Sequence, residues 1–451
     1  MVIVFVLIIL LVLALFGAVH WYMWRRLVRD TTTGPGLARR VGAAVFIAGP
    51  LLFVAAMTAE RGGAPFWLQQ VLAWPGFLWL ALVLYLLLAL LVGEVVRPLV
   101  RRVVERRSAP EAPAVPEAVG EREPVAVAAP DAVVGAGAGQ AGAGAMEPVS
   151  EGEGAEGDGT SDDGSEAAAT SGSAASGPSR RLFVSRVVGG AAAAAALGTV
   201  GYGTYGVLRG PKVKRVTVPL AKLPRSAHGF RIAVVSDIHL SPVLGRGFAQ
   251  TVVDTINSTQ PDLIAVVGDL VDGSVKDLGP AAAPLARLKA RHGSYFVTGN
   301  HEYISGVEQW VEHVRELGIT PMENVRTELP DFDLAGVNDV AGEDEGQGPD
   351  FEKALGDRDR ARACVLLAHQ PVQIHDAVDH GVDLQLSGHS HGGQLWPGNF
   401  VAALANPTVA GLERYGDTQL YVSRGAGAWG PPTRVGAPSD ITVVELASRQ
   451  A

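Results

Sequence analysis

Five short stretches of the sequence carry side chains that can bind metal ions, and each follows an apolar run typical of a buried strand. In the first, the run Arg231-Ile-Ala-Val-Val235 is followed by Asp237 and His239. Side chains at positions i and i+2 of an extended chain point to the same side, so both can reach one ion. The five stretches are Asp237-Ile-His239, Gly268-Asp-Leu-Val-Asp272, Gly299-Asn-His-Glu302, Ala368-His-Gln-Pro371 and Gly388-His-Ser-His-Gly-Gly-Gln394.

These stretches contain seven candidate metal ligands: Asp237, His239, Asp269, Asn300, His369, His389 and His391. The C-terminal ends of parallel strands share one edge of a sheet, so we expect these side chains to converge. Two ions that share one bridging carboxylate need about that many ligands, with water completing the coordination. Oxygen and imidazole ligands without thiolate suit Mn, Fe, Zn or similar divalent ions. The single cysteine, Cys364, lies in an apolar run and is expected to be a buried strand residue.

The chemistry that such a site supports is hydrolysis of a phosphate ester. Two cations about 3.5–4 Å apart neutralise the phosphoryl oxygens and acidify a bridging water, and the resulting hydroxide attacks phosphorus. His301, next to Asn300, is placed to protonate the leaving oxygen. We expect Asp272 to cap or orient a loop and Glu302 to hydrogen-bond a ligand histidine.

Together and in this order, the five stretches resemble the calcineurin-like metallophosphoesterase superfamily. They are most similar to its membrane-anchored bacterial branch, whose closing motif is Gly-His-x-His-Gly-Gly-Gln. The resemblance covers about residues 213–446 and implies a double β-sheet sandwich flanked by helices, with His301 as the catalytic imidazole. It also implies two ligand groups with one bridging residue. Asp237, His239 and His391 would bind one ion, and Asn300, His369 and His389 would bind the other. Asp269 would bridge the two ions.

The elements that must position these residues form an α/β domain over residues 211–451. Strands and helices alternate in its first half, which favours βαβ units and a sheet covered on both faces. One helix, Gly306–Leu317, places Val307, Trp310, Val311 and Val314 on one stripe. The remaining predicted helices are Phe248–Asn257 and Ala281–Ala290. The predicted strands are Val213–Leu220, Phe230–Val235, Asp262–Val267, Ser294–Thr298, Phe332–Val337, Ala363–Ala368, Leu384–Leu386, Leu420–Val422 and Ile441–Glu445.

Residues 1–107 are predicted to form a helical membrane region with three spans. The apolar runs cover about residues 2–21, 41–57 and 74–96. Arginines follow the first and third runs, whereas the loop between the second and third is nearly neutral. Because basic loops favour the cytoplasm, this pattern predicts an external N-terminus and a cytoplasmic residue 100.

Residues 108–178 hold thirteen acidic residues and one basic residue among Ala, Gly, Pro and Ser, which predicts a disordered linker. Residues 179–210 begin with Ser179-Arg-Arg-Leu-Phe183 and continue as an Ala/Gly-rich apolar run. This segment resembles a twin-arginine export signal, and the alternative is a plain fourth transmembrane helix. Both interpretations send the following domain outward.

We therefore expect a multi-pass protein of the cell membrane with an extracytoplasmic two-metal phosphoesterase domain. The expected partners are the bilayer, the twin-arginine export machinery and a phosphodiester or phosphomonoester substrate, with lipid or cell-envelope esters favoured by the anchor. No basic patch predicts nucleic-acid binding. Two alternatives remain open: a metal-stabilised binding or sensor module without catalysis, and a cytoplasm-facing nucleotide phosphodiesterase. Sequence alone leaves the substrate-binding residues unknown.

Overall fold

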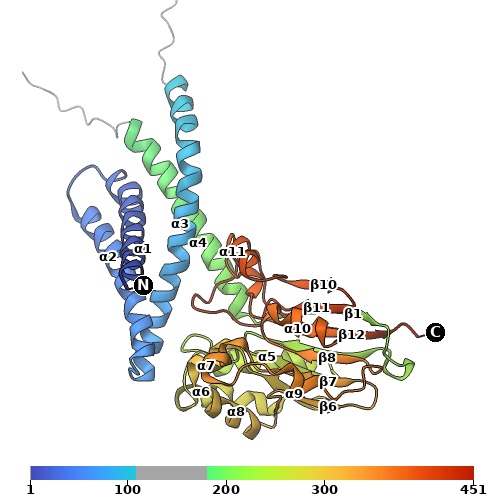
Figure 1. Ribbon diagram of the computed structural model, residues 1–451. Helices are drawn as coiled ribbons and strands as arrows, with labels where there is room; N and C mark the ends of the chain where they lie inside the picture. The colour runs from blue at the N-terminus through green and yellow to red at the C-terminus, as the bar shows by residue number, and fades with distance from the viewer. Residues whose placement is uncertain (1, 108–179, 451) are drawn as a thin grey trace, which may run out of the picture. The chain divides into compact units, whose positions relative to one another are not determined.

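The computed structural model describes residues 2–107 and 180–450 (Figure 1). Four of its helices are long and apolar enough to cross a membrane, by length and composition. They contain the predicted apolar segments: α1 (Val2–Trp24), α2 (Leu37–Arg61), α3 (Phe66–Arg107) and α4 (Arg180–Leu208). The predicted linker over residues 108–178 lies outside the described residues.

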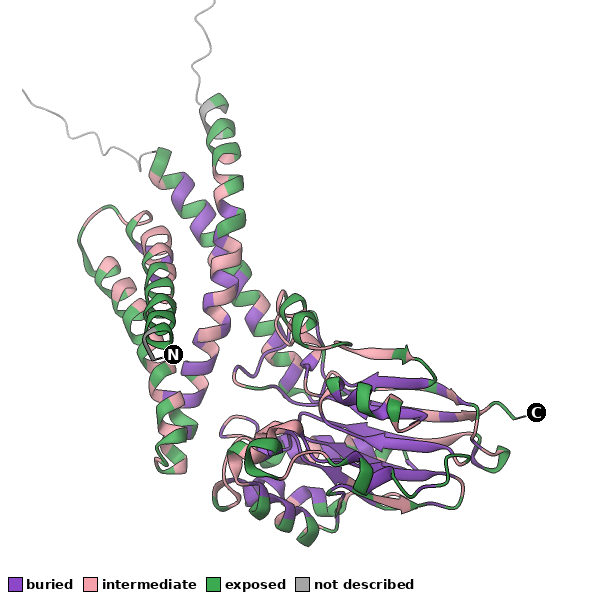
Figure 2. Ribbon diagram, in the orientation of Figure 1, coloured by how far each residue is buried: buried purple, intermediate pink, exposed green. Residues whose placement is uncertain are grey.

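The apolar helices share a small core of their own. Met23 of α1, Trp79 and Leu90 of α3, and Ala192 and Ala196 of α4 are all buried in it. The large side chains of α1 are otherwise mostly exposed in the protein alone, as Figure 2 shows. An apolar helix that exposes its side chains in this way suits a lipid environment.

The rest of the described chain folds into two six-stranded sheets (Figure 1). The first sheet has the order β1-β12-β2-β3-β4-β5, and strands β2 to β5 run parallel. Its strands are β1 (Lys212–Leu220), β12 (Asp440–Ser448), β2 (Phe230–Val235), β3 (Leu263–Val267), β4 (Ser294–Val297) and β5 (Thr320–Pro321). The second sheet has the order β10-β11-β9-β8-β7-β6, and its four central strands run parallel. Its strands are β10 (Gly411–Tyr415), β11 (Thr418–Val422), β9 (Leu384–Ser387), β8 (Cys364–Leu367), β7 (Asp333–Gly336) and β6 (Val325–Glu328).

Alternating strand residues build three apolar layers around these sheets. Ile232 and Val234 of β2 face the core between the two sheets, whereas Ala233 and Val235 face the helices on the outer side. The outer helices of the first sheet are α5 (Arg246–Ser258), α6 (Val275–Ala282) and α8 (Val307–Glu316), and those of the second sheet are α9 (Phe351–Leu355) and α10 (Ile374–Asp379). The predicted double sandwich flanked by helices is therefore confirmed.

Most predicted elements appear within one to three residues of their expected ends. The stripe of α8 is confirmed, because Val307, Trp310, Val311 and Val314 are all buried. The predicted helix Ala281–Ala290 is wrong: α6 ends at Ala282 and a 3-10 helix follows over Ala283–Arg287. Prolines at positions 280 and 284 explain the change, since each removes a backbone donor that a continuous α-helix would use.

Candidate metal centre

The candidate ligands follow the C-terminal ends of parallel strands in both sheets. Asp237 and His239 follow β2, Asp269 follows β3, and Asn300 begins a short helix, α7 (Asn300–Ser305), after β4. In the second sheet, one candidate follows β8 and two follow β9: His369, His389 and His391. The structure brings all seven together where the two sheets meet.

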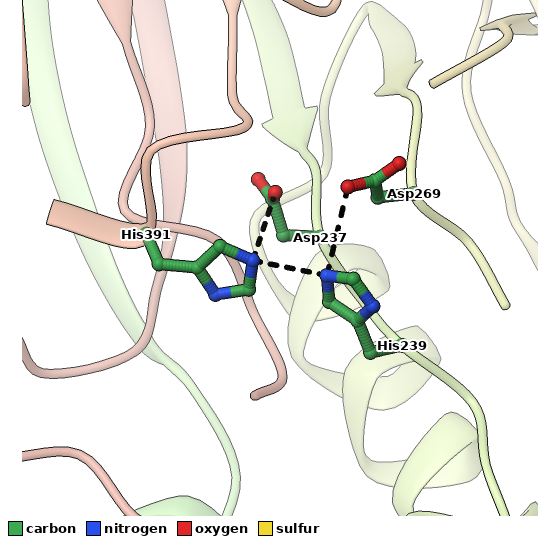
Figure 3. Close-up of side chains that lie close together, drawn as sticks. All are labelled: Asp237, His239, Asp269 and His391. Carbon is green, nitrogen blue, oxygen red and sulfur yellow. Dashed lines mark hydrogen bonds and ion pairs between the residues drawn. The ribbon is translucent and has the colours of Figure 1, made fainter. Parts of the chain in front are cut away.

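The first group of ligand atoms comes from Asp237, His239, Asp269 and His391, and all four atoms lie within 4.8 Å of one another. Figure 3 shows these side chains converging from both sheets. The Nε2 atoms of His239 and His391 lie 3.0 Å apart. His391 Nε2 is 3.3 Å from Asp237 Oδ1, and His239 Nε2 is 3.7 Å from Asp269 Oδ2. One ion could bind between these four atoms.

The second group comprises Asp269, His369 and His389, with Asn300 beside it. His369 Nε2 lies 3.1 Å from Asp269 Oδ2, and His389 Nδ1 lies 2.9 Å from Asn300 Oδ1. Asp269 belongs to both groups, as a bridging carboxylate must. The structure thus divides the seven residues into the two sets that the sequence resemblance implies.

One ring nitrogen of His369 faces Asp269. His369 donates from Nδ1 to the carbonyl of Val267 at 2.9 Å, and its buried Nε2 lies 3.1 Å from Asp269 Oδ2. Burial would lower the pKa of His369, but its acidic neighbours, led by Asp269, raise it well above its usual range, so a bound cation would replace the proton on Nε2. A ring held through its other nitrogen is typical of ligand histidines. His391 differs, because its Nδ1 lies 3.1 Å from the guanidinium of Arg434, a group that only donates. The case for His391 as a metal ligand therefore rests on its position opposite Asp237 and His239.

Electrostatics keep two ligand histidines neutral, the state in which imidazole binds a cation. Burial, and then the neighbouring His239 and Arg434, hold the pKa of His391 well below its usual range. Burial and the charge of His369 lower the pKa of His389 to about 4. Burial would raise the pKa of Asp269, but the charges of His369, His239 and His301 together outweigh burial and keep that pKa well below normal. Asp269 is thus ionised.

Asp272 holds two histidines at once, a role that sequence reasoning missed. Its Oδ1 accepts hydrogen bonds from His239 Nδ1 at 2.8 Å and from His301 Nδ1 at 2.7 Å. These bonds point the opposite nitrogen of each ring away from Asp272. Burial would lower the pKa of His301, but the hydrogen bond and charge of Asp272 raise it to about 9. The expectation that Asp272 merely orients a loop was wrong; the only sequence signal was its spacing, three residues after Asp269.

Glu302 was expected to contact a ligand histidine, and this expectation is also wrong. Its buried carboxylate accepts instead from three backbone N–H groups, those of Gly299 at 2.6 Å, Asp269 at 3.0 Å and Leu270 at 2.8 Å. These bonds tie the loop after β3 to the first turn of α7. Glu302 therefore fixes the backbone that carries Asp269.

Five of the seven candidate ligands have a positive backbone φ: Asp237, His239, Asp269, His389 and His391, with values between 47° and 71°. Non-glycine residues avoid this left-handed region, at a cost of roughly 1–2 kcal/mol each. Such strain gathers where function requires it. Glycines make room for these turns: a Cβ on Gly388 would collide with the Asp237 carboxylate, and one on Gly299 with that of Asp269.

Comparison with known proteins places these features in one family. A family model described as calcineurin-like phosphoesterase matches residues 230–393. A transmembrane protein with a metallophosphoesterase domain from Danio rerio is 40% identical over 259 residues, which cover 54% of this chain and 59% of that protein. An uncharacterized metallophosphoesterase from Helicobacter pylori strain J99 is 38% identical over 255 residues, which cover 56% of this chain and 68% of that protein. The chain belongs to the metallophosphoesterase family.

Solved structures match part of this metallophosphoesterase at low sequence identity. A dimetal phosphatase from Danio rerio is 13% identical, with a TM-score of 0.34, over 49% of this chain and 93% of that one. The match to the zebrafish transmembrane relative covers less than two thirds of that protein's length. The long apolar helices, together with the similarity to a relative named a transmembrane protein, support membrane association of the chain.

Proposed function

We propose that the protein hydrolyses a phosphodiester or phosphomonoester with two divalent metal ions. The observation that carries this proposal is the pair of ligand groups that share Asp269, next to the hydrogen-bonded pair Asp272 and His301. When bound, two such ions neutralise the phosphoryl oxygens and supply an activated water. The nitrogen and oxygen ligands suit Mn, Fe or Zn.

The chain's own residues then hold and move protons. His301 uses Nδ1 to donate to Asp272, which leaves Nε2 to hydrogen-bond a phosphate oxygen or to protonate the leaving oxygen. In the metal-free protein the pKa of His301 is raised to about 9, chiefly by Asp272, and the hydrogen bond to Asp272 favours the charged imidazole that a general acid needs. His239 is held by the same carboxylate, so one buried Asp272 orients both a metal ligand and the proton donor.

The proposed location is the outer face of the membrane, with the four apolar helices as spans. Arginine-rich segments after the first and third apolar runs support this topology, because positive loops stay in the cytoplasm. The twin-arginine-like start of α4 supports it independently. A site anchored there would meet lipid or cell-envelope phosphoesters.

Hydrolysis by the full chain in detergent tests the activity. We would measure release of p-nitrophenol from bis-p-nitrophenyl phosphate and p-nitrophenyl phosphate, with Mn²⁺, with chelator, and in the His301→Ala variant. We expect turnover that requires the metal and falls on the order of 10²–10⁴-fold in the variant. No turnover with any divalent ion, in a chain that binds two ions, would favour the binding or sensor module instead.

A reporter fused after residue 451 tests the location. A reporter that works only outside the cytoplasm should be active, and alkaline-phosphatase-type reporters serve this purpose. Activity of a cytoplasm-only reporter would contradict the outward topology and would favour the cytoplasm-facing nucleotide phosphodiesterase.

A further inference from the structure

An uncharged, apolar segment directly follows the ligand His391. The sequence carries no charged residue between His391 and Glu413. Within this segment lies helix α11 (Gly398–Ala405), which has no buried residue. Phe400, Val401 and Leu404 are 64%, 69% and 87% exposed. Adjacent exposed apolar side chains of this kind mark a site of contact with lipid or with another protein.

Two tryptophans extend this surface toward the catalytic histidine. Trp396 precedes α11 and is half exposed, and Trp429 lies on a neighbouring loop and is also more than half exposed. Gln394 joins the two segments: its Nε2 donates to the carbonyl of Trp429 at 2.9 Å, and its Oε1 accepts from the N–H of Trp429 at 3.0 Å. The Trp429 ring packs edge-on against His301, with centroids 5.7 Å apart. We call α11, Trp396 and Trp429 the apolar rim.

The base of the rim is attached to the apolar helices. The hydroxyl of Tyr85, within α3, donates to the carbonyl of Trp396 at 2.9 Å. Leu395 and Val435 pack against the core that Met23 and Trp79 form among those helices. The residues on either side of the rim thus contact helices that require lipid around them. A bilayer that surrounds these helices is therefore the nearest apolar environment for α11.

We propose that the apolar rim inserts into the bilayer that holds α1–α4 and that the metal centre takes phosphoesters whose apolar part lies in that bilayer. Exposed Trp residues beside aliphatic side chains are typical of a membrane interface. Phe400 and Leu404 are four residues apart, so they share one face of α11 and enter the lipid together. The substrate class rests on the proposed phosphoesterase function; the insertion of the rim does not.

Site-directed spin labelling of the full chain tests the insertion. The only native cysteine, Cys364, is buried, so a label can be placed selectively at Leu404→Cys. Asp417→Cys, on the exposed hairpin between β10 and β11, is the matched control. In vesicles of phosphatidylcholine and phosphatidylglycerol, collisions with lipid-soluble oxygen should dominate at position 404, and collisions with a water-soluble nickel complex should dominate at position 417.

Two outcomes of this experiment would overturn the insertion. A label at position 404 as accessible to the nickel complex as the label at position 417 would place α11 in water. A label shielded from both probes would mean that a second copy of the chain or another protein covers α11. Neither outcome depends on catalysis, so it leaves the proposed phosphoesterase activity untouched.

Activity with two kinds of substrate tests the substrate class. The Phe400→Ser/Leu404→Ser variant should hydrolyse phosphatidic acid or phosphatidylglycerol in vesicles at least about tenfold more slowly than the parent chain, because its rim no longer partitions into lipid. The same variant should hydrolyse p-nitrophenyl esters at the parent rate. The control variant Val325→Ser, on the edge strand β6, should hydrolyse both the lipids and the p-nitrophenyl esters at the parent rates. A parent chain that hydrolyses the soluble esters but neither lipid would overturn the lipid substrate class while leaving the phosphoesterase function intact.

Discussion

Replacement of Asp272 is the most informative single change at this site, because one oxygen holds two histidines. The Asp272→Ala variant removes the acceptor for His239 Nδ1 at 2.8 Å and for His301 Nδ1 at 2.7 Å. A hydrogen bond to a charged group contributes roughly 1.5–3 kcal/mol. If both bonds act in the transition state, the loss is about 3–6 kcal/mol, which corresponds to a fall in kcat/KM on the order of 10²–10⁴-fold.

The Asp272→Asn variant separates charge from geometry. Its amide oxygen can still accept from both rings, but the negative charge is gone. We expect a smaller loss of about 10–100-fold, typical of groups that orient metal ligands. The matched control is Asp254→Asn on the exposed face of α5, where the carboxylate accepts from Gln250 and lies outside the metal centre. That variant should keep the parent activity.

Release of p-nitrophenol by the full chain in detergent, combined with metal content and circular dichroism, is the assay. A double-mutant cycle with His301→Ala measures how much of the effect of the Asp272 substitution on kcat/KM depends on His301. If Asp272 acts partly through His301, Asp272→Asn should cost less in the His301→Ala background than in the parent chain. Parent-like kcat/KM in a folded Asp272→Ala variant would refute the reasoning, and so would an undiminished effect of Asp272→Asn once His301 is absent.

Two further substitutions and one labelling experiment test other features of the structure. His301→Ala should lower kcat on the order of 10²–10⁴-fold while the metal content stays at the parent value; loss of metal would assign His301 to the ligands instead. Gly388→Ala should reduce both metal content and activity, because the new Cβ meets the Asp237 carboxylate, whereas Gly190→Ala, with open space around its Cα, should do neither. Burial raises the pKa of the Cys364 thiol to about 12, so a thiolate-specific reagent at pH 8 should label the chain only after denaturation; rapid labelling of the folded chain would contradict this burial.

The strand-end motifs made the site predictable because their geometry is local. An apolar run that stops at a glycine, or directly at Asp237, positions the next polar side chain at the sheet edge whatever the rest of the chain does. Parallel pairing of β2, β3 and β4 then brings those edges together. The two groups around Asp269 follow from this topology, which the family resemblance supplied.

The roles of Asp272 and Glu302 depend on contacts between residues far apart in the sequence, which a local sequence pattern does not predict. The double hydrogen bond of Asp272 requires His239 and His301 to approach from different strands. Glu302 finds backbone partners across the loop after β3, which its own sequence neighbours do not suggest. Helix α11 escaped prediction because the nine uncharged residues between Pro397 and Pro407 provide no charged face opposite the apolar one.

Metal stoichiometry of the full chain and two variants tests the central claim most directly. We expect two divalent ions per parent chain, one ion in His369→Ala, because His369 belongs to one group, and none in Asp269→Ala, because Asp269 belongs to both. Elemental analysis of the purified, folded proteins gives these numbers. A parent chain with a single ion, or an Asp269→Ala variant that keeps both ions, would contradict the shared two-metal centre.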